Sequence, residues 1–597
     1  MYKQLKKLYQ LLSAVQRIKL LRLQFLVVLM AFAEVGGVFA IGPFMALVAD
    51  MSALHSGGIV TDIFQLSGLT ENSFIFWVGV SVLLVLTVAA CISMLTTWRL
   101  ATYSFRLGAE LGVRLFKHYM QQPWLFHANG SSSTLINKIA AESNRLTAQI
   151  INPLLQMVAR LVLIVTMAIA IFIYDPKVAL SGLLIFSMGY FVLYRTARRK
   201  LQSNGKIITD ANRLRMSLMQ EGFGGIKDTL LLGRQADFNE RFEKSSLDFG
   251  RAQGNNAVLA QVPRYAMELL AFGSIILLVL YLLSFYNGNL SQVLPTLAVY
   301  SLAGFRLLPA FQQVYVATTS IRGNIAAFEN LLEDFENSQG AQTGKPAEAF
   351  GRLSVKNEIT LSNIHFCYPG KEQGALNGIN IRIPTNKVIG VVGASGSGKS
   401  TAIDILLGLI EPDSGQLLVD EKPINTENRR AWQNSLGYVS QAIFLSDSSI
   451  RENIAFGLPA TKIDEDRVKQ ATRLAHLDEL VDSLPEGLDT RVGERGIQLS
   501  GGQRQRIGIA RALYSDADVL VFDEATSALD GITERLVMDA IHDFTGKKTI
   551  VLIAHRLATV KACDCIYLMS AGRVVDSGTY DDLIERNKMF KKMAAQA

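Results

Sequence analysis

Long uncharged apolar runs occupy the first 320 residues of the chain and largely disappear after them. At roughly 1.5 Å of rise per residue, each run is about long enough to cross some 30 Å of hydrocarbon as a tilted helix. We expect six membrane-spanning helices, at residues 25–49, 74–98, 153–174, 178–194, 265–286 and 290–315. The pattern therefore predicts an all-helical membrane domain, which we place at residues 1–330.

The pattern changes after a polar stretch with small residues, Asn337–Glu348, which has the composition of a linker. Short apolar strands then alternate with helical segments, and this alternation is typical of an α/β domain with a largely parallel sheet. We expect the linker at residues 331–350 and the α/β domain at residues 351–597. The fold class is thus a multi-domain chain.

Basic residues cluster at one end of the apolar runs. The segment before the first span carries Lys3, Lys6, Lys7, Arg17, Lys19 and Arg22, whereas Asp50–Ser73 between the first two spans has no Lys or Arg. Positive charge stays on the cytoplasmic side of a membrane, so both termini are expected in the cytoplasm. The net charge of +7 accompanies no basic stripe interleaved with aromatics, which argues against nucleic-acid binding.

The loops between spans are unequal. Two cytoplasmic segments, Arg99–Asn152 and Arg195–Arg264, are long and helical in pattern, with short turns near residues 126–133 and 222–229. The spans should therefore continue as helices into the cytoplasm and carry force through those turns. The external segment 59–66 has an apolar face that suits a short helix on the outer membrane surface, with an ordinary loop as the alternative.

Charged residues also occur inside or near the apolar runs. Glu34, Arg160 and Glu268 each cost about 2.5–3.5 kcal/mol at mid-bilayer, so each should face protein or a water-filled cavity. A contact between helices and a contact with a transported molecule are both open for them. Arg264 and Arg306 lie near span ends, where snorkelling to the interface is the simplest alternative to a binding role.

The α/β half contains a glycine-rich phosphate-binding sequence. A short apolar strand, residues 388–392, runs into Gly393, Ala394, Ser395, Gly396, Ser397, Gly398, Lys399, Ser400 and Thr401, where a helix begins. In such a P-loop, backbone N–H groups cradle the phosphates of ATP, Lys399 reaches the β- and γ-phosphates, and the Ser400 hydroxyl ligates Mg²⁺.

Three further strand ends carry side chains suited to ATP hydrolysis. Residues 519–522 precede Asp523 and Glu524, which we expect to support Mg²⁺ through water and to act as general base. His555 follows another strand and is placed to contact the γ-phosphate. Gln441 follows a third and can reach both Mg²⁺ and the attacking water. Ligands bind at the carboxyl ends of parallel strands, so these residues should converge.

The sequence Leu499-Ser500-Gly501-Gly502-Gln503 has no evident role inside its own chain. A Ser-Gly-Gly turn ahead of a helix presents N–H groups to an anion outside it. Together with the P-loop it indicates an ATP site completed by a second copy of the same domain.

These motifs resemble those of ATP-binding cassette exporter half-transporters, and the resemblance covers nearly the whole chain. It implies a six-helix type I exporter membrane domain followed by a P-loop ATPase domain, working as a homodimer with ATP and Mg²⁺. It further implies that Tyr368 stacks on adenine, that Ser500, Gly501, Gly502 and Gln503 contact ATP held by the partner, and that Asp530 lies in the loop that crosses the dimer interface.

The membrane half is similar to one branch of these exporters in the runs 262–273 and 300–309 and in the short external segment. That branch contains the bacterial flippase of lipid-linked oligosaccharides in protein N-glycosylation. The resemblance implies an inner-membrane location and a glycolipid substrate whose pyrophosphate meets Arg264 and Arg306. Guanidinium groups suit bidentate contacts with phosphate.

Other functions stay open at this stage. The cargo could be another amphiphile, such as lipid A core or drugs, and the protein could be an ATP-gated membrane regulator that transports nothing. The six spans exclude a soluble ATPase. A peptide exporter with an N-terminal cysteine protease is disfavoured, because the first 50 residues contain neither Cys nor His.

Overall fold

The structure is a computed structural model, and it describes residues 2–49, 51–54, 59–174, 176–285, 290–338, 350–493, 496–523, 538, 544–554 and 556–595. The chain forms two compact units. The first comprises residues 1–122 and 130–342, and the second comprises residues 123–129 and 343–597. A seven-residue piece of the helical half thus belongs with the α/β domain.

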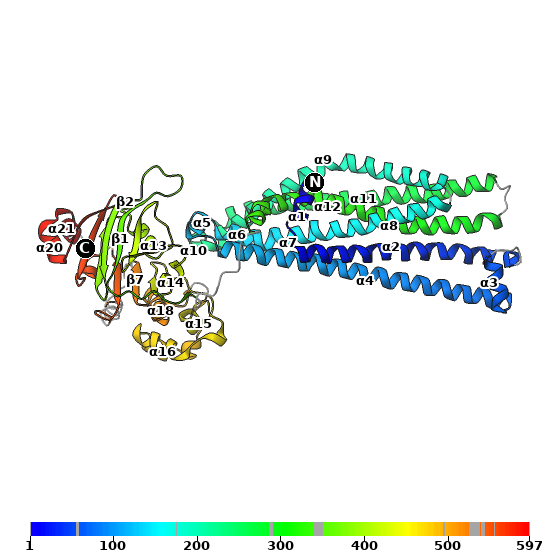
Figure 1. Ribbon diagram of the computed structural model, residues 1–597. Helices are drawn as coiled ribbons and strands as arrows, with labels where there is room; N and C mark the ends of the chain where they lie inside the picture. Colours follow the sequence, from blue (N-terminus) through cyan, green and yellow to red (C-terminus); the bar gives the residue numbers. More distant parts are fainter. Residues whose placement is uncertain are drawn as a thin grey trace. The chain divides into compact units, whose positions relative to one another are not determined.

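The described part of the first unit consists of helices joined by short turns. Its elements are α1 (Tyr2–Gln10), α2 (Ala14–Ala49), a 3₁₀ turn (Met51–Leu54), α3 (Ile59–Ser67), α4 (Glu71–Met120), α6 (Ser132–Asn137), a π-helical turn (Lys138–Glu142), α7 (Ser143–Leu146), a second π-helical turn (Thr147–Ile151), α8 (Asn152–Tyr174), α9 (Pro176–Gly224), α10 (Ile226–Leu231), α11 (Gln235–Phe285) and α12 (Leu290–Asn337). Figure 1 shows its long helices running side by side.

All six predicted spans fall on long helices: α2, α4, α8, α9, α11 and α12. Within the described residues, three stretches are long and apolar enough to cross a membrane, Ala14–Val48, Glu71–Met120 and Ser132–Ile173. The helices α4, α9 and α11 extend far beyond the predicted spans, which confirms that the spans continue as helices. The segment 59–66 is helical, the first of the two options that its sequence left open: Phe64 of α3 packs edge-on against Phe74 of α4 at 5.2 Å.

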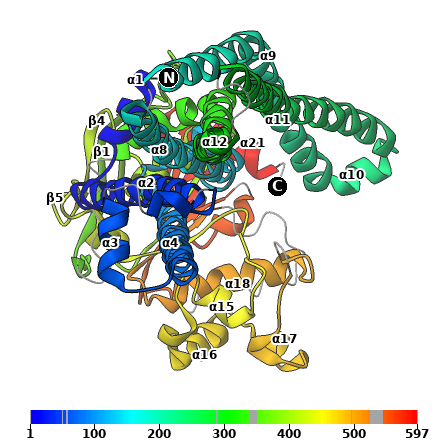
Figure 2. The ribbon, with the colours of Figure 1, turned by 90° about the vertical axis from the view of Figure 1, so that its right-hand side faces the viewer.

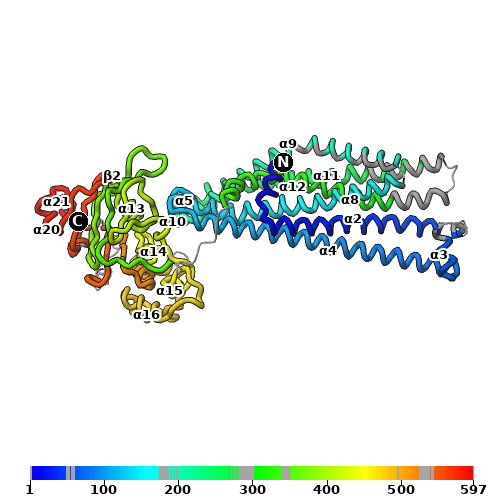
Figure 3. The backbone as a smooth tube through the Cα atoms, in the orientation of Figure 1, coloured from blue at the N-terminus to red at the C-terminus, as the bar shows by residue number. Residues whose placement is uncertain are grey.

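The helices pack in a definite set of pairs. The tube in Figure 3 follows α2 alongside α4, and α2 also packs on α8 and α12. The other close pair is α9 with α11, which Figure 2 shows well away from α3 and α4. Gly108 of α4 permits one close approach, because a Cβ there would lie 1.9 Å from the Thr147 hydroxyl oxygen.

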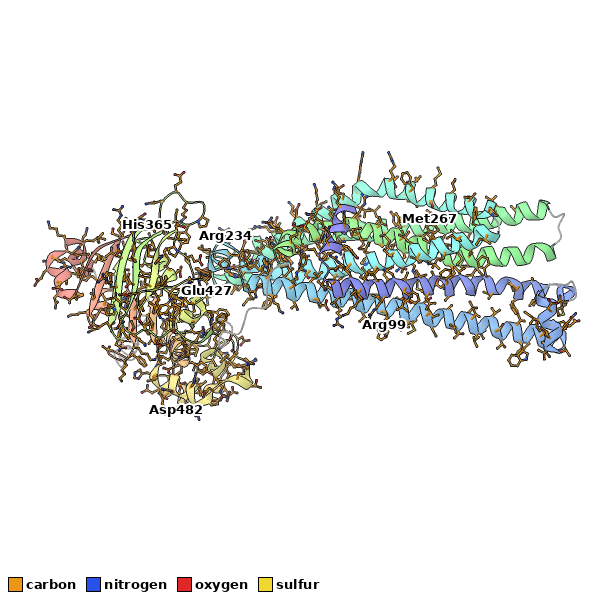
Figure 4. All side chains as sticks on the ribbon, in the orientation of Figure 1. Arg99, Arg234, Met267, His365, Glu427 and Asp482 are labelled. Atoms are coloured by element: carbon orange, nitrogen blue, oxygen red, sulfur yellow. The ribbon has the colours of Figure 1, made fainter. Side chains whose placement is uncertain are left out.

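A proline interrupts the hydrogen bonding of α11, just before Arg264. Pro263 has no N–H to donate to the carbonyl of Leu259, four residues earlier. The buried Tyr315 of α12 supplies the missing donor, with its hydroxyl 3.2 Å from the Leu259 oxygen. Next to this joint, Met267 of α11, labelled in Figure 4, is fully buried with Tyr315. The contact fixes α11 against α12 beside the candidate substrate arginine.

The described residues of the second unit form two sheets. An antiparallel sheet has the order β2-β1-β4-β5, and a six-stranded sheet has the order β10-β9-β3-β8-β7-β6. The strands are β1 (Glu358–Phe366), β2 (Leu376–Pro384), β3 (Val388–Gly393), β4 (Ser414–Val419), β5 (Lys422–Pro423), β6 (Leu436–Val439), β7 (Val519–Asp523), β8 (Thr549–Ile553), β9 (Cys565–Ser570) and β10 (Arg573–Gly578). Except for β10, neighbouring strands of the second sheet are parallel.

Helices cover the faces of this unit. They are α5 (Trp124–Asn129), α13 (Lys399–Leu406), α14 (Arg429–Gln433), α15 (Ile450–Ile454), α16 (Glu465–Leu474), α17 (Asp478–Ser483), α18 (Gly501–Tyr514), α20 (Tyr580–Arg586) and α21 (Lys588–Ala595), with 3₁₀ turns at Ala460–Lys462, Gly487–Asp489 and Leu557–Val560. Neighbouring residues of the central strands pack into two different hydrophobic cores. In β3, Val388 and Val392 belong to one core, and Ile389 and Val391 belong to the other. Burial on both faces explains the continuous apolar strands.

Replacing Tyr315 by Phe should leave the Leu259 carbonyl without its donor while the packing is retained. We expect the variant to lose about 0.5–2 kcal/mol of stability, measured as a lower unfolding temperature of the purified protein. Tyr9→Phe, at an exposed tyrosine, is the matched control. An unchanged melting temperature for Tyr315→Phe would contradict the assigned role.

Candidate functional site

Four parallel strands bring the predicted nucleotide residues to one edge of the sheet. β3, β8, β7 and β6 are adjacent and parallel, so their carboxyl ends lie together. The register pairs Asp523 with Ile553 and Val439 with Phe522. The loops after all four strands therefore emerge beside one another, as expected for a ligand site in such a sheet.

The P-loop needs its glycines for steric reasons. A Cβ on Gly393 would lie 2.3 Å from the Met569 carbonyl oxygen of the neighbouring strand β9. Gly398 has a φ of +99°, and a Cβ there would lie 2.8 Å from the Ala375 oxygen. Side chains at either position would force the loop away from the sheet, and the N–H groups that precede α13 would lose their arrangement.

Within this loop, Lys399 is buried and its ammonium donates to the carbonyls of Gly393 at 2.9 Å and Ala394 at 3.1 Å. The loop residues 394–396 are exposed, and so is Ser400 in the first turn of α13. Exposed N–H groups and a hydroxyl around a buried cation form a cradle suited to an anion.

Tyr368 lies next to the P-loop helix. Its hydroxyl is 3.2 Å from the Thr401 hydroxyl, and its ring meets Phe366 edge-on at 5.1 Å. Lys371 lies 5.9 Å from the ring centroid. The structure thus brings together the predicted adenine-stacking ring and the predicted phosphate loop; stacking on adenine itself stays a prediction.

Asp523 ends β7 and accepts a hydrogen bond at 3.3 Å from the Tyr438 hydroxyl on β6. Burial, followed by the negative charge of Asp523, raises the pKa of Tyr438. Tyr438 was missed in the sequence, although it lies three residues before Gln441. The exposed Gln441 follows the same strand. Glu524, His555 and Asp530 lie outside the described residues.

Ser500 caps helix α18 through a reciprocal capping box. The Gln503 N–H donates to the Ser500 hydroxyl at 3.2 Å, and the Ser500 N–H donates to the Gln503 side chain at 2.8 Å. The Ser-x-x-Gln spacing is the sequence signature of this motif, which both residues form in addition to their predicted contact with ATP. Ser500 and Gly501 are exposed, whereas Gly502 is buried.

The charged residues singled out in and near the predicted spans form ion pairs with one another. Arg264 and Glu268, one turn apart on α11, lie 2.6 Å apart. Glu34 of α2 is buried between Arg160 of α8 at 3.9 Å and Arg306 of α12 at 3.8 Å. Polar contact between helices, one of the two options left open by the sequence, is therefore present for Glu34 and Arg160.

Two family models match the chain. The ABC transporter transmembrane region matches residues 24–308, and the ABC transporter model matches residues 376–527. The chain belongs to the ABC transporter family. Among curated relatives, the ATP-dependent lipid A-core flippases of Escherichia coli (strain K12) and Salmonella paratyphi A (strain ATCC 9150 / SARB42) are each 27% identical over 565 residues, covering 93% of this chain and 96% of each relative.

A solved structure of a bacterial Atm1-family ABC exporter with ATP bound has the same fold. Its TM-score is 0.76 at 20% identity, with 98% of this chain and 99% of that one covered. These matches confirm an ABC exporter half-transporter with a type I exporter membrane domain, and an ATP-hydrolysing transport function.

In this ABC exporter, α5 is a piece of the helical half that docks on the ATPase domain. Leu125 packs against the core under α13, and the Trp124 side chain stabilises the charged form of the Asp404 carboxylate on that helix. Burial raises the pKa of Asp404 to about 6; Trp124 opposes this rise, and the charge of Asp523 adds to it. The pKa of the Asp404 carboxyl therefore depends both on Trp124 of α5 and on the charge of Asp523.

The raised pKa of Asp404 predicts a pH-dependent stability. A carboxyl whose folded-state pKa exceeds its ordinary value of 3.8 destabilises the fold when charged, above about pH 6, and the penalty disappears as pH falls below that ordinary value. Because Asp404 is only partly buried, we expect Asp404→Asn to gain about 1–2 kcal/mol at pH 8, about a third of that near pH 4.5 and almost nothing near pH 3.

Unfolding of the purified exporter, followed across this pH range, measures the effect. Asp447→Asn, at an exposed loop position, is the control and should behave as the unmodified protein does. A loss of stability for Asp404→Asn at pH 8 would overturn the account.

Proposed function

We propose that two copies of this exporter form a homodimer in the bacterial inner membrane and use ATP to flip an undecaprenyl-pyrophosphate-linked oligosaccharide to the outer leaflet. The observation that carries the cargo is the pair Arg264 and Arg306, whose side chains are about half exposed on helices that carry predicted spans. Guanidinium groups recognise phosphate in bidentate geometry. The similarity to lipid A-core flippases supports lipid flipping in general.

We assign residues 1–330 to the membrane domain, 331–350 to the linker and 351–597 to the ATP-binding cassette, with both termini in the cytoplasm. The first part of this linker continues helix α12 as far as Asn337. In each cassette the P-loop holds the phosphates and Tyr368 stacks on the adenine. Ser400, Gln441 and Asp523 follow or end parallel strands at one sheet edge, and they offer the hard oxygen donors that Mg²⁺ prefers. Bound Mg²⁺ would neutralise charge on the phosphates.

We assign catalysis to Glu524 as general base, with Gln441 and His555 orienting the water and the γ-phosphate. Ser500–Gln503 and Asp530 act across the dimer on the partner's ATP. The capping box supports this role for Ser500 and Gly501, because it fixes the helix start while both residues stay exposed. Closure of two shared sites would then move the docked α5 with the cassette.

Loss of both arginines should stop the transport of this cargo. For Arg264→Ala/Arg306→Ala in proteoliposomes, we expect at least about a tenfold fall in flipping of the lipid-linked oligosaccharide, since two phosphate contacts are removed. ATP hydrolysis without cargo should stay near that of the unmodified protein.

Arg106→Ala is the matched control, because Arg106 forms an i,i+4 pair with Glu110 on α4 outside the predicted spans. Undiminished flipping by the double variant would refute the arginine role.

A second candidate cargo is lipid A core, and its only support is the similarity of this chain to lipid A-core flippases. The same assay with that lipid separates the two cargoes. Glu524→Gln separates a transporter from an ATP-gated regulator: a transporter should stop moving cargo in this variant, whereas a regulator needs only to bind ATP.

A further inference from the structure

Each candidate substrate arginine is held by a carboxylate. Arg264 pairs with Glu268, and Arg306 pairs with Glu34. In each pair the arginine is the more exposed partner: 53% against 27% for the first and 47% against 4% for the second. The arginines can therefore turn to a ligand more readily than the carboxylates can follow them.

Glu34 has more than one partner. Its Oε1 accepts a hydrogen bond from Ser93 of α4 at 2.8 Å and lies 3.9 Å from Arg160, while its Oε2 faces Arg306. Arg160 is only 26% exposed and is itself held by Gln313 of α12 at 3.0 Å. If Arg306 left, Glu34 would keep Ser93 and Arg160, so no buried carboxylate would be left uncompensated.

The two pairs lie at neighbouring levels of α11 and α12. Phe272, one turn beyond Glu268, meets Phe305 edge-on at 6.2 Å, and Phe305 directly precedes Arg306. Three arginines and two glutamates leave one net positive charge per chain in these clusters. Two chains would together match the charge of about −2 on a pyrophosphate diester.

We propose that Glu34 is an internal counter-ion that occupies Arg306 when no anionic lipid is bound, and that a phosphate of the cargo displaces it while Arg160 and Ser93 retain it. This inference rests on the proposed function, since it assumes that Arg306 meets phosphate. Its consequence is that Glu34 competes with the cargo. Such competition weakens binding, and it helps release the cargo, because the carboxylate can take back the arginine.

Replacing Glu34 by Gln removes the competing charge but keeps the shape and the hydrogen bond from Ser93. We expect the full-length dimer in nanodiscs to bind undecaprenyl pyrophosphate at least about fivefold more tightly, with slower flipping. Binding of the uncharged undecaprenol should not change. In the Arg306→Ala background, Glu34→Gln should give no gain, because the competed group is absent.

A second variant, Glu34→Asp, keeps the charge but is one methylene shorter, so it reaches Arg306 less well; a smaller gain in the same direction is expected. Glu110→Gln is the control for loss of an arginine partner elsewhere on the chain.

The outcomes separate the two claims. If Arg306→Ala weakens binding but neither Glu34 variant tightens it, the counter-ion role is wrong and the proposed function stands. If the variants tighten binding equally with and without Arg306, the displacement step is wrong. If loss of Arg264 and Arg306 leaves binding unchanged, the proposed function fails first.

Discussion

A charged carboxylate among apolar helices must be compensated, and much of the membrane half is arranged around that requirement. Glu34 of α2 accepts a hydrogen bond from Ser93 of α4 and forms ion pairs with Arg160 of α8 and Arg306 of α12. One buried side chain therefore connects four helices. Pro263 creates a similar demand on the backbone, and Tyr315 meets it. Polar groups that cannot reach water thus specify which helices are neighbours.

The ATPase half depends on a different constraint, the shared edge of its parallel strands. That edge places the P-loop, Tyr438 and Asp523 together, and it leaves α13 to receive α5 through Asp404. The P-loop, which we propose holds ATP, and the surface that receives α5 therefore share helix α13. A change at the phosphates has a short physical route to α5, through α13 and the charges of Asp523 and Asp404.

Local patterns were predictable from the sequence. Apolar runs predicted the long helices that carry the six spans, and short motifs predicted the P-loop and the strand that ends in Asp523. Contacts between distant residues were not predictable. Nothing in the pattern pairs Glu34 with Arg306, or Trp124 with Asp404, because these pairs depend on how helices far apart in the sequence pack. The Ser500–Gln503 capping box could have been predicted from its Ser-x-x-Gln spacing, but the same residues also indicate a contact with a ligand. The structural units also do not follow the chain order: residues 123–129 belong with the second unit, although they lie within the helical half of the sequence.

We propose that this ATP-driven exporter carries an anionic lipid held by Arg264 and Arg306. Native mass spectrometry of the dimer, released directly from membranes, tests it most directly. We expect a pyrophosphate-linked glycolipid to remain bound to the unmodified dimer and to be lost from the variant without Arg264 and Arg306. Retention of only uncharged lipids, or of the same glycolipid in that variant, would contradict it.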